Sequence, residues 1–417
     1  MSCVPQTLFR FEDTVGNISA AVWCNIKSMK VNVEFLSSEP LNNVITCMRY
    51  EMDKVLFFGY EDKIERMQKV TESFLKKYCG VKETEFVSLP EGDFDGIRKA
   101  IRVTVTKEVI RGNRMYFDIT GGDSLILVAF GQLSTEFTAS MHMFDVPQNR
   151  LIEFNHGPIH LLSADAKQRT EQYNLDHFIE MQGGVINYRL QKNIKKDEDS
   201  EFGHDIDAIF DVAKKEWEVW NPFSEFLRTR MVPDENLRVV RKTEKVKAML
   251  SSSGGRLRKI ERFSEIIDSL AEKGVLQEVE HNDEVYRFRF KNKEIKDCVW
   301  ESGSILEMNV YGKEKAVSDD CRVGVHLDWD GVIHQKGFSD VINEVDVLSL
   351  KGNIVTFISC KSGKMDSKQT LHALYELDTV ANRFGGKYAR KVLVSAQRLS
   401  ENYLERAREM GIEVRWE

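Results

Sequence analysis

The chain reads INEVDVL at residues 342–348, carries a Gly-Asn pair at residues 352–353, and reads FISCK at residues 357–361. In both outer segments apolar side chains are interleaved with polar ones, which is typical of strands. A Gly-Asn pair between two such segments is typical of the tight turn of a hairpin. The three segments therefore predict two strands joined by a tight turn.

Four polar side chains decide what this hairpin does. Because successive side chains of a strand alternate between its faces, Glu344 and Asp346 share one face of the first strand. By the same rule Ser359 and Lys361 share one face of the second strand. Two carboxylates and a lysine would then converge on one small site, which suits a divalent cation and a water that attacks a phosphodiester. The alternative is an ordinary cross-strand ion pair.

Size and charge set the limits of the interpretation. The chain has 417 residues, which exceeds one ordinary domain and predicts about two or three. An apolar fraction of 42% is enough for sizeable cores. The formal charge of -7 argues against a surface covered with nucleic acid, although a local basic groove is compatible with it.

Cysteine usage and hydropathy indicate the compartment. The seven cysteines form no Cys-x-x-Cys pair, so neither a zinc site nor a disulfide framework is indicated, and we expect a reducing cytoplasm. No apolar run approaches the roughly 20 residues that span a membrane, so we expect no membrane partner. Residues 1–29 carry acids ahead of a short apolar piece, which is unlike a signal peptide, and we interpret them as an N-terminal extension.

Strands alternate with helices from residue 30 to about residue 154. This order predicts an α/β domain with a mostly parallel, doubly wound, Rossmann-like sheet, which a hairpin near residues 139–154 closes. The expected strands are residues 30–36, 54–59, 84–89 and 114–119, and the expected helices are residues 41–51, 62–78, 93–109 and 124–133.

Two loops at the carboxyl ends of these strands form a candidate ligand site, because doubly wound sheets bind ligands there. Two glycines in the second loop let the backbone approach a ligand closely, and its amides stand at a helix N-terminus suited to phosphate. A plain Gly-Gly connection is the alternative. The loops consist of Ser37, Ser38 and Glu39, and of Thr120, Gly121, Gly122, Asp123 and Ser124.

Residues 156–290 are less regular and predict helices plus a hairpin, similar to a small winged-helix module. Between Arg238 and Arg262 there are nine lysines and arginines against two acids. Such a run suits contacts with phosphates, and a solvated helix face beside a flexible linker is the alternative.

From about residue 291 the pattern is again α/β, with a helix expected over residues 298–313 ahead of the hairpin. Glu307 lies in that helix, and Asp346 precedes Lys361 by fifteen residues. This order fits a restriction-endonuclease-like core. In such a core carboxylates bind Mg²⁺ or Mn²⁺, and the lysine orients or helps to deprotonate the attacking water.

Five motifs together resemble one family, the CRISPR ancillary nucleases of the Card/Can type. Members of this family combine an N-terminal CARF domain, which senses a cyclic oligoadenylate, with a C-terminal restriction-endonuclease-like nuclease domain of the PD-(D/E)xK type. The motifs are DITGG at residues 118–122, GSILE at residues 303–307, NEVDV at residues 343–347, FISCK at residues 357–361 and RAREMGI at residues 406–412.

The resemblance divides the chain into four parts. An N-terminal extension occupies residues 1–29, and the CARF sensor domain is expected at residues 30–155. A helical linker with a winged-helix-like module is expected at residues 156–290, where the family matches only in architecture. The nuclease domain is expected at residues 291–417.

Individual residues carry over from the family by position. Asp346 matches the metal-binding acid, Lys361 the catalytic lysine, and Glu307 a helix glutamate that lines the active site. In the sensor loop the chain departs from the family, because Asp123 and Ser124 stand where many CARF domains have threonine and lysine. The missing cation removes one partner for a ligand phosphate.

A second departure concerns the metal. Ser359 stands where the family often has glutamate, and serine cannot supply the same charge to a cation. We expect Glu344, on the face predicted for Asp346, or the backbone carbonyl of Cys360 to compensate. Asp346, Glu344 and Cys360 are therefore the expected metal ligands, and Ser359 remains among the expected catalytic residues.

Together these features predict a homodimeric nuclease that cyclic tetra-adenylate switches on and that uses Mn²⁺ or Mg²⁺. A near two-fold cyclic ligand suits a site shared by two identical domains. The ligand would shift an existing equilibrium toward a closed nuclease by binding that state more tightly. DNA, cut by nicking, is the first expected substrate and RNA the second.

Two other functions stay open. Ser359 is compatible with a degenerate nuclease core, which would make the protein a ligand-responsive regulator that binds nucleic acid. A ring nuclease that degrades its own activator would need a nucleophile or general base near Ser37 or Thr120, and the sequence does not show one convincingly. The ring size of the activator and the balance between DNA and RNA are not determined by the sequence.

Overall fold

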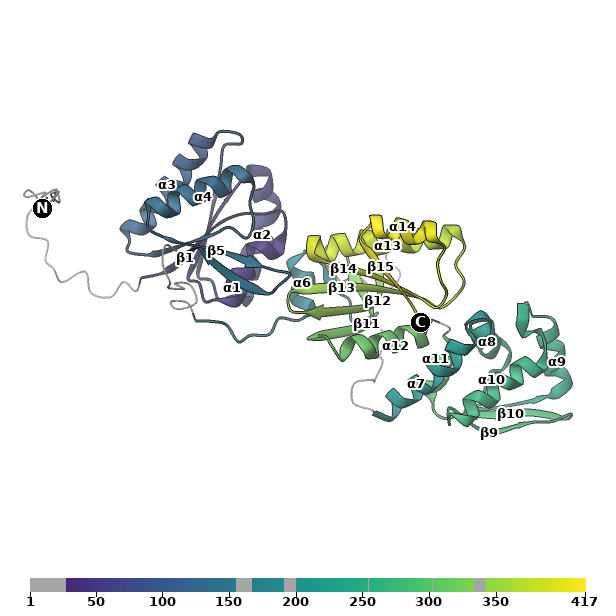
Figure 1. Cartoon of the computed structure of the whole chain (residues 1–417). Coiled ribbons are helices and arrows are strands. Elements are labelled where there is room, and N and C mark those ends of the chain that lie inside the picture. The colour runs from purple at the N-terminus through teal and green to yellow at the C-terminus, as the bar shows by residue number, and fades with distance from the viewer. Residues whose placement is uncertain (1–27, 155–166, 191–199, 254, 302, 334–341) are drawn as a thin grey trace, which may run out of the picture.

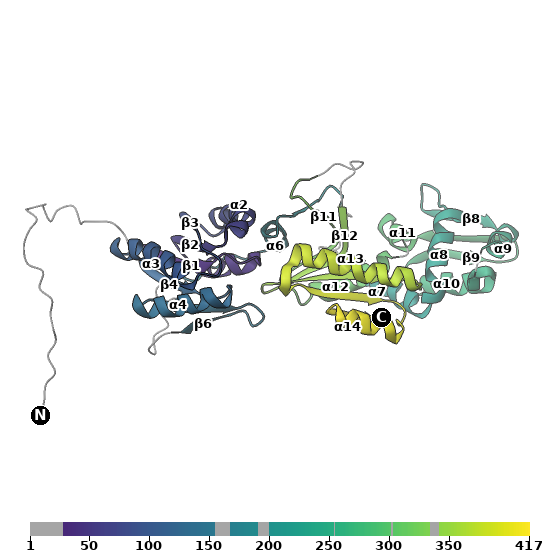
Figure 2. The same ribbon diagram turned by 90° about the horizontal axis from the view of Figure 1, so that it is seen from above.

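The computed structural model describes residues 28–154, 167–190, 200–253, 255–301, 303–333 and 342–417. It consists of an N-terminal sheet domain, a helical module and a C-terminal sheet domain, arranged in a row in both views (Figures 1 and 2). The C-terminal domain lies in the centre of the row, and the module from the middle of the sequence lies at the far end. The expected extension at residues 1–29 falls almost entirely outside the described residues.

The N-terminal domain is built on a six-stranded sheet with the order β3-β2-β1-β4-β5-β6. Neighbouring strands are parallel except for the closing β5–β6 pair. Helices cover both faces, and the doubly wound α/β fold predicted from the sequence is confirmed. The strands are β1 Lys30–Phe35, β2 Lys54–Gly59, β3 Glu83–Ser88, β4 Arg114–Asp118, β5 Ser140–Asp145 and β6 Arg150–Phe154, and the main helices are α2 Glu61–Tyr78, α3 Phe94–Ile110 and α4 Ser124–Glu136.

The central strands β1 and β2 are buried almost along their whole length, as parallel strands covered on both faces are. One expected helix differs from the prediction. Residues 41–51 form a 3₁₀ turn, Pro40–Asn43, followed by the five-residue helix α1, Ile45–Arg49. The side chain of Asn43 accounts for the break, because it accepts a hydrogen bond from Ser37 N at 2.7 Å and donates one to Ser37 O at 2.8 Å. It thereby ties the segment back to the loop after β1.

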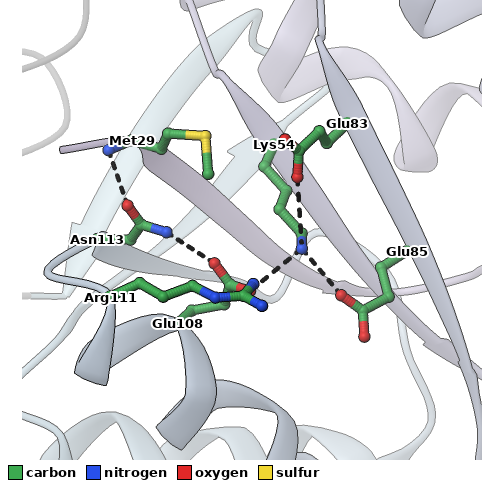
Figure 3. A network of polar contacts seen from close by, with 7 residues as sticks. All are labelled: Met29, Lys54, Glu83, Glu85, Glu108, Arg111 and Asn113. Carbon is green, nitrogen blue, oxygen red and sulfur yellow. Dashed lines mark hydrogen bonds and ion pairs between the residues drawn. The ribbon is translucent and has the colours of Figure 1, made fainter. Parts of the chain in front are cut away.

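A buried ion-pair network joins the amino ends of the strands, opposite the edge that carries the candidate ligand loops (Figure 3). At its centre Lys54 Nζ lies 3.2 Å from Glu108 Oε1, and the two side chains are only 5% and 2% exposed. The network holds together the residues at or just before the start of strands β1, β2, β3 and β4. Its members are Met29, Lys54, Glu83, Glu85, Glu108, Arg111 and Asn113.

Lys54→Met is expected to lower the free energy of unfolding by about 3–5 kcal/mol, because it leaves the Glu108 carboxylate buried without its main cation. Chemical denaturation followed by circular dichroism measures the change. Lys82→Met is the matched control, since Lys82 is 66% exposed in its pair with Asp53 and its removal should cost less than about 1 kcal/mol. Equal losses in the two variants would contradict a special role for the buried pair.

The middle module combines four helices with a small antiparallel sheet of order β8-β10-β9. Its core contains Trp220, Phe223 and Phe263 and continues into the face of the C-terminal sheet that α12 covers. The arrangement is similar to a winged helix. The elements are α7 Ser200–Lys215, α8 Trp217–Arg230, β8 Arg238–Lys242, α9 Thr243–Ser251, α10 Ile260–Glu272, β9 Leu276–His281 and β10 Val285–Phe290.

The C-terminal domain has a mixed six-stranded sheet of order β15-β14-β13-β12-β11-β7. Helices α13 and α14 pack on one face, and α12 packs on the other. The strands are β7 Val185–Ile186, β11 Asp320–Asp328, β12 Ile342–Lys351, β13 Ile354–Lys361, β14 Arg390–Ser395 and β15 Ile412–Trp416, and the helices are α12 Ser304–Lys315, α13 Ser367–Gly385 and α14 Glu401–Glu409.

Two features of this domain were not predicted. The helix expected over residues 298–313 is two helices, α11 Lys293–Trp300 and α12, because the chain turns at Glu301, which has an extended backbone. The edge strand β7 comes from the middle of the sequence and pairs with β11. Two residues are too short a segment to show a periodic pattern, so the sequence carried no signal for it.

Helix α6, Leu175–Met181, connects the N-terminal and C-terminal domains. It packs against α2 on one side and against α13 on the other. Glu180 of α6 accepts hydrogen bonds from Lys77 Nζ at 2.9 Å and from the Tyr78 hydroxyl at 2.5 Å.

Across the described residues, every helix is too short or too polar to cross a membrane.

Candidate catalytic and ligand-binding sites

The predicted hairpin opens at Asp346. The antiparallel pairs of β12 and β13 run from Lys351–Ile354 to Val347–Ile358, and the next facing position joins Asp346 to Ser359. There the Asp346 carboxylate, and not a backbone carbonyl of β12, accepts the next hydrogen bond from β13. Asp346 Oδ2 accepts a hydrogen bond from Cys360 N at 2.6 Å and another from the Ser359 hydroxyl at 3.2 Å.

Lys361 completes this group. Its Nζ lies 3.8 Å from Asp346 Oδ2, and both side chains are partly exposed, at 32% and 16%. The structure therefore brings together Asp346, Ser359 and Lys361, as the alternation along the two strands predicts. A carboxylate and an ammonium group that remain accessible at an opened strand end form a site rather than a sealed ion pair.

Strand β12 is irregular at Asp346 on its other side as well. The pairs with β11 join Val323 to Val347 and Val325 to Val345, and between them Gly324 adopts a φ of +59° that favours glycine. As a result Val345 packs in the core under α13, whereas Val347 packs in the core under α12. Residues two apart in a regular strand would share a face. Simple alternation therefore fails across Asp346, and the shared face predicted for Glu344 and Asp346 does not follow from it.

A hollow of about 140 Å³ lies above this point, between the hairpin and α13. Sequence reasoning missed one of its polar residues, Glu376. Ala373, Leu377 and Val380 place one face of α13 on the sheet, and this helical spacing was the available signal that residue 376 stands beside it. The polar side chains among the lining residues are Glu344, Asp346, Ser359, Lys361 and Glu376.

Two predicted residues lie elsewhere. Cys360 is buried on the α12 face, and Glu307 of α12 stands close enough to influence its thiol. Burial raises the pKa of the Cys360 thiol well above its ordinary value, and the carboxylates of Asp346 and Glu307 raise it further. The thiol therefore stays protonated, and only the backbone carbonyl of Cys360 is left as a metal ligand. Glu307 is not among the residues that line the hollow.

The donors around the hollow are of the kind that hard divalent cations prefer, since three carboxylates line it. As the side chains stand, however, no group of three Asp, Glu, His or Cys side chains in the described part of the chain is compact enough to hold a metal ion. The oxygen donors fit Mg²⁺ or Mn²⁺ in kind. At least one glutamate must turn toward Asp346 before they fit in geometry.

The two predicted ligand loops lie side by side at the carboxyl ends of the adjacent strands β1 and β4. A Cβ atom on Gly121 would come within 3.1 Å of Ser37 Cβ and 3.3 Å of Asn42 Cβ, so a side chain there would push these neighbours slightly apart and glycine favours the close contact. The Thr120 hydroxyl accepts a hydrogen bond from Phe144 N at 2.8 Å. Ser38, Gly122 and Ser124 are exposed at the rim of the loops.

Asp123 has a structural task in its loop. It caps α4 by accepting a hydrogen bond from Ile126 N at 3.1 Å, and it accepts another from the Tyr60 hydroxyl at 2.5 Å. Burial raises the pKa of Tyr60 to about 12, and the hydrogen bond to Asp123 adds to the rise. The acid that stands where many CARF domains have threonine is therefore a helix cap held by a tyrosine.

Glu39, predicted among the ligand-binding residues, lies between the two sheet domains. It is 8% exposed and contacts the C-terminal domain. Glu39 Oε2 accepts a hydrogen bond from Lys387 N at 2.8 Å, and nearby Asn42 Oδ1 accepts one from the Tyr388 hydroxyl at 3.0 Å. The loop after β1 thus contacts Gly121 on one side and the segment between α13 and β14 on the other. A contact between domains that are distant in sequence leaves no local pattern to find.

A buried polar cluster holds the second loop from below. Asp118, at the end of β4, accepts hydrogen bonds from Thr120 N at 2.8 Å and from the Thr46 hydroxyl at 2.6 Å, and lies 3.1 Å from His142 Nε2. Burial alone would raise the pKa of Asp118, but His142 and the hydrogen bonds outweigh it and lower the pKa to about 2. Glu34 is the opposite case, since burial and the charge of Asp118 raise its pKa well above the ordinary range.

Glu34→Gln is expected to stabilise the protein at neutral pH. In the unfolded chain Glu34 loses its proton above a pKa of about 4.3, whereas in the native protein its raised pKa keeps the proton bound. The free energy of unfolding therefore falls as pH rises from about 4.3 to the raised native pKa. The amide removes that cost, which is about 1.4 kcal/mol for each unit by which the two pKa values differ. Urea unfolding at about pH 4.5 and about pH 7.5 should show a gain that grows with pH. A gain independent of pH would contradict the assignment.

Comparisons with known proteins bear on the fold and on the class of the C-terminal domain. Residues 294–416 match the model of the Card1-like endonuclease domain. Protein VC1899 from Vibrio cholerae shares the fold with a TM-score of 0.68 at 18% identity, over 93% of this chain and 94% of that one. Can2 from Sulfobacillus thermosulfidooxidans, solved in complex with cyclic tetra-adenylate, gives a TM-score of 0.62 at 14% identity, over 93% of each chain.

No curated protein matches the chain by sequence. The two solved structures establish the fold over almost the whole chain, and the domain model identifies the class of its C-terminal part. The resemblance to CRISPR ancillary nucleases of the Card/Can type is thereby confirmed.

Proposed function

We propose that the protein is a metal-dependent nuclease of type III CRISPR defence that a cyclic oligoadenylate activates. The observation that carries this proposal is the opened hairpin, where Asp346, the Cys360 amide and Lys361 meet inside a domain of an endonuclease family. A lysine and a carboxylate 3.8 Å apart beside an accessible hollow suit hydrolysis of a phosphodiester.

Each residue has a separate task in this reaction. The Cys360 amide and the Ser359 hydroxyl hold the Asp346 carboxylate in one orientation. Lys361 Nζ positions the attacking water and favours its deprotonation. A bound Mg²⁺ or Mn²⁺ would neutralise charge that develops on the phosphate. We propose Asp346 and the Cys360 carbonyl as its ligands, completed by one of the two glutamates at the hollow, Glu344 or Glu376.

The activator site is proposed at the loops after β1 and β4, where Ser37 and Gly121 meet. Can2, which shares the fold, binds cyclic tetra-adenylate, and this supports the same ligand here. Exposed Ser38 and Ser124, with the backbone of Gly122, are the groups we assign to its phosphates. A cyclic ligand with near two-fold symmetry suits two copies of this surface, so we propose a homodimer.

The route from activator to nuclease is the segment from Ser37 to Arg49. It touches Gly121 at its start and the C-terminal domain through Glu39 and Asn42. At its end Arg49 Nη2 donates a 2.6 Å hydrogen bond to Asn353 Oδ1, in the turn of the hairpin that carries Asp346 and Lys361. Binding that moves this segment acts on the residues that precede β13 and β14, provided that the activator prefers one position of it.

The substrate is proposed to be DNA first and RNA second. The basic run of the middle module supports this less than the sequence suggested. Arg238, Arg256 and Arg262 form ion pairs with acids of the same module, and Arg241 donates to backbone carbonyls. Contacts with phosphate would therefore depend on its remaining cations.

A second candidate is a regulator that binds nucleic acid without cutting it. The observation that favours it is Ser359, which donates a hydrogen bond to Asp346 and brings no charge to the hollow. The two candidates differ in whether Lys361 is needed for a chemical step.

Lys361→Ala is expected to lower activator-dependent cleavage by roughly 10²–10⁴-fold, because the water loses its positioning cation. The assay uses supercoiled plasmid and single-stranded RNA with Mn²⁺, with and without cyclic tetra-adenylate. Lys368→Ala, on the exposed first turn of α13, is the matched control and should cleave like the wild type. Wild-type protein that binds both activator and DNA but cuts neither polymer would favour the regulator.

Arg49→Gln and Glu39→Gln are expected to uncouple the domains. Arg49→Gln removes the guanidinium that donates to Asn353, and Glu39→Gln removes the negative charge of the group that accepts from Lys387 N. Each change weakens the contact of the segment from Ser37 to Arg49 with the C-terminal domain, so stimulation of cleavage by the activator should fall about fivefold or more. Calorimetric titration with cyclic tetra-adenylate should still show binding. Complete loss of binding in Glu39→Gln with normal binding in Arg49→Gln would return Glu39 to the ligand site.

A further inference from the structure

The immediate contacts of Asp346 leave little surplus negative charge at the place where a metal is proposed. Asp346 and Lys361 lie 3.8 Å apart and offset one another, and Ser359 adds only a hydroxyl that donates to Asp346. Divalent cations of the Mg²⁺ and Mn²⁺ type bind where carboxylates give a surplus of negative charge. A second carboxylate must therefore join Asp346 if the proposed metal-dependent reaction is correct.

We propose that Glu376 of α13 supplies this carboxylate and binds the divalent metal ion together with Asp346. Glu376 lines the same hollow as Asp346, Ser359 and Lys361 although it lies on a different element. Its neighbours Leu377 and Val380 are 5% and 4% exposed in the core between α13 and the sheet, so the backbone at residue 376 is firmly placed.

The side chain of Glu376 is free to turn toward Asp346. It is 48% exposed, and its contact among the described residues is a 3.6 Å pair with His372, whose side chain is 75% exposed. An exposed pair at this helical spacing is weak, so it does not hold the Glu376 carboxylate in its present position.

Glu344, the other glutamate at the hollow, is the weaker choice. It pairs in register with His326, and the next residue, Val345, packs in the core under α13. Because adjacent strand residues face opposite ways, the side chain of Glu344 leaves β12 on the face opposite to Val345 and α13, although Glu344 still lines the hollow. Glu376, by contrast, belongs to α13 itself, which borders the hollow.

Binding of Mn²⁺ to the purified full chain, measured by isothermal titration calorimetry without nucleic acid, tests the proposal independently of cleavage. Glu376→Gln should weaken Mn²⁺ binding at least about tenfold, and Glu376→Asp should recover part of it. Glu405→Gln, on the exposed face of α14, is the control and should bind like the wild type. Equal melting temperatures of Glu376→Gln and wild type confirm that the variant is folded.

Three outcomes decide the matter. Weakened binding in both Asp346→Asn and Glu376→Gln supports the two-carboxylate site. Normal binding in Glu376→Gln, with binding lost in Asp346→Asn or in Glu344→Gln, overturns the role of Glu376 and leaves the proposed function intact. Absence of Mn²⁺ binding in the wild type overturns both, because the proposed reaction then lacks its metal.

Discussion

The hydrogen bond from Cys360 N to the Asp346 carboxylate, at 2.6 Å, is the interaction on which the C-terminal domain's chemistry depends. It stands where the β12–β13 ladder ends, so a side chain rather than a backbone carbonyl satisfies the amide. The strands separate there without leaving a buried donor unpaired, which would be costly. The same bond orients Asp346 beside Lys361 and leaves both accessible. The hydrogen bond that ends the pairing of the two strands is therefore also the one that positions the candidate site.

A second constraint joins the two sheet domains. The loops after β1 and β4 meet through Gly121, and the segment that begins at Ser37 continues to the C-terminal domain through Glu39 and Arg49. Beneath the loops, Asp118 holds Thr120 from a fully buried position. A ligand bound at these loops, as we propose, would act on exposed groups that rest on this buried cluster. Packed interiors transmit such displacements because they contain little free volume.

Much of the fold was predictable because it is periodic. The alternation of strands and helices over residues 30–154 defines a parallel sheet, and the hairpin was found from its alternating side chains and its turn. Asp346, Ser359 and Lys361 were found together for the same reason. The predictions failed where periodicity stops, as at the break between α11 and α12 and at the two-residue strand β7.

By itself the sequence determined the doubly wound N-terminal sheet, the hairpin, and the pairing of one carboxylate with one lysine. These are properties of neighbouring residues, because side-chain direction in a strand depends on position along it. Only the tertiary structure decided that Glu39 contacts Lys387 of the C-terminal domain, that Gly324 breaks the alternation opposite Asp346, and that Glu376 stands at the hollow. Each of these depends on contacts between segments far apart in the chain, which packing selects and no local pattern records.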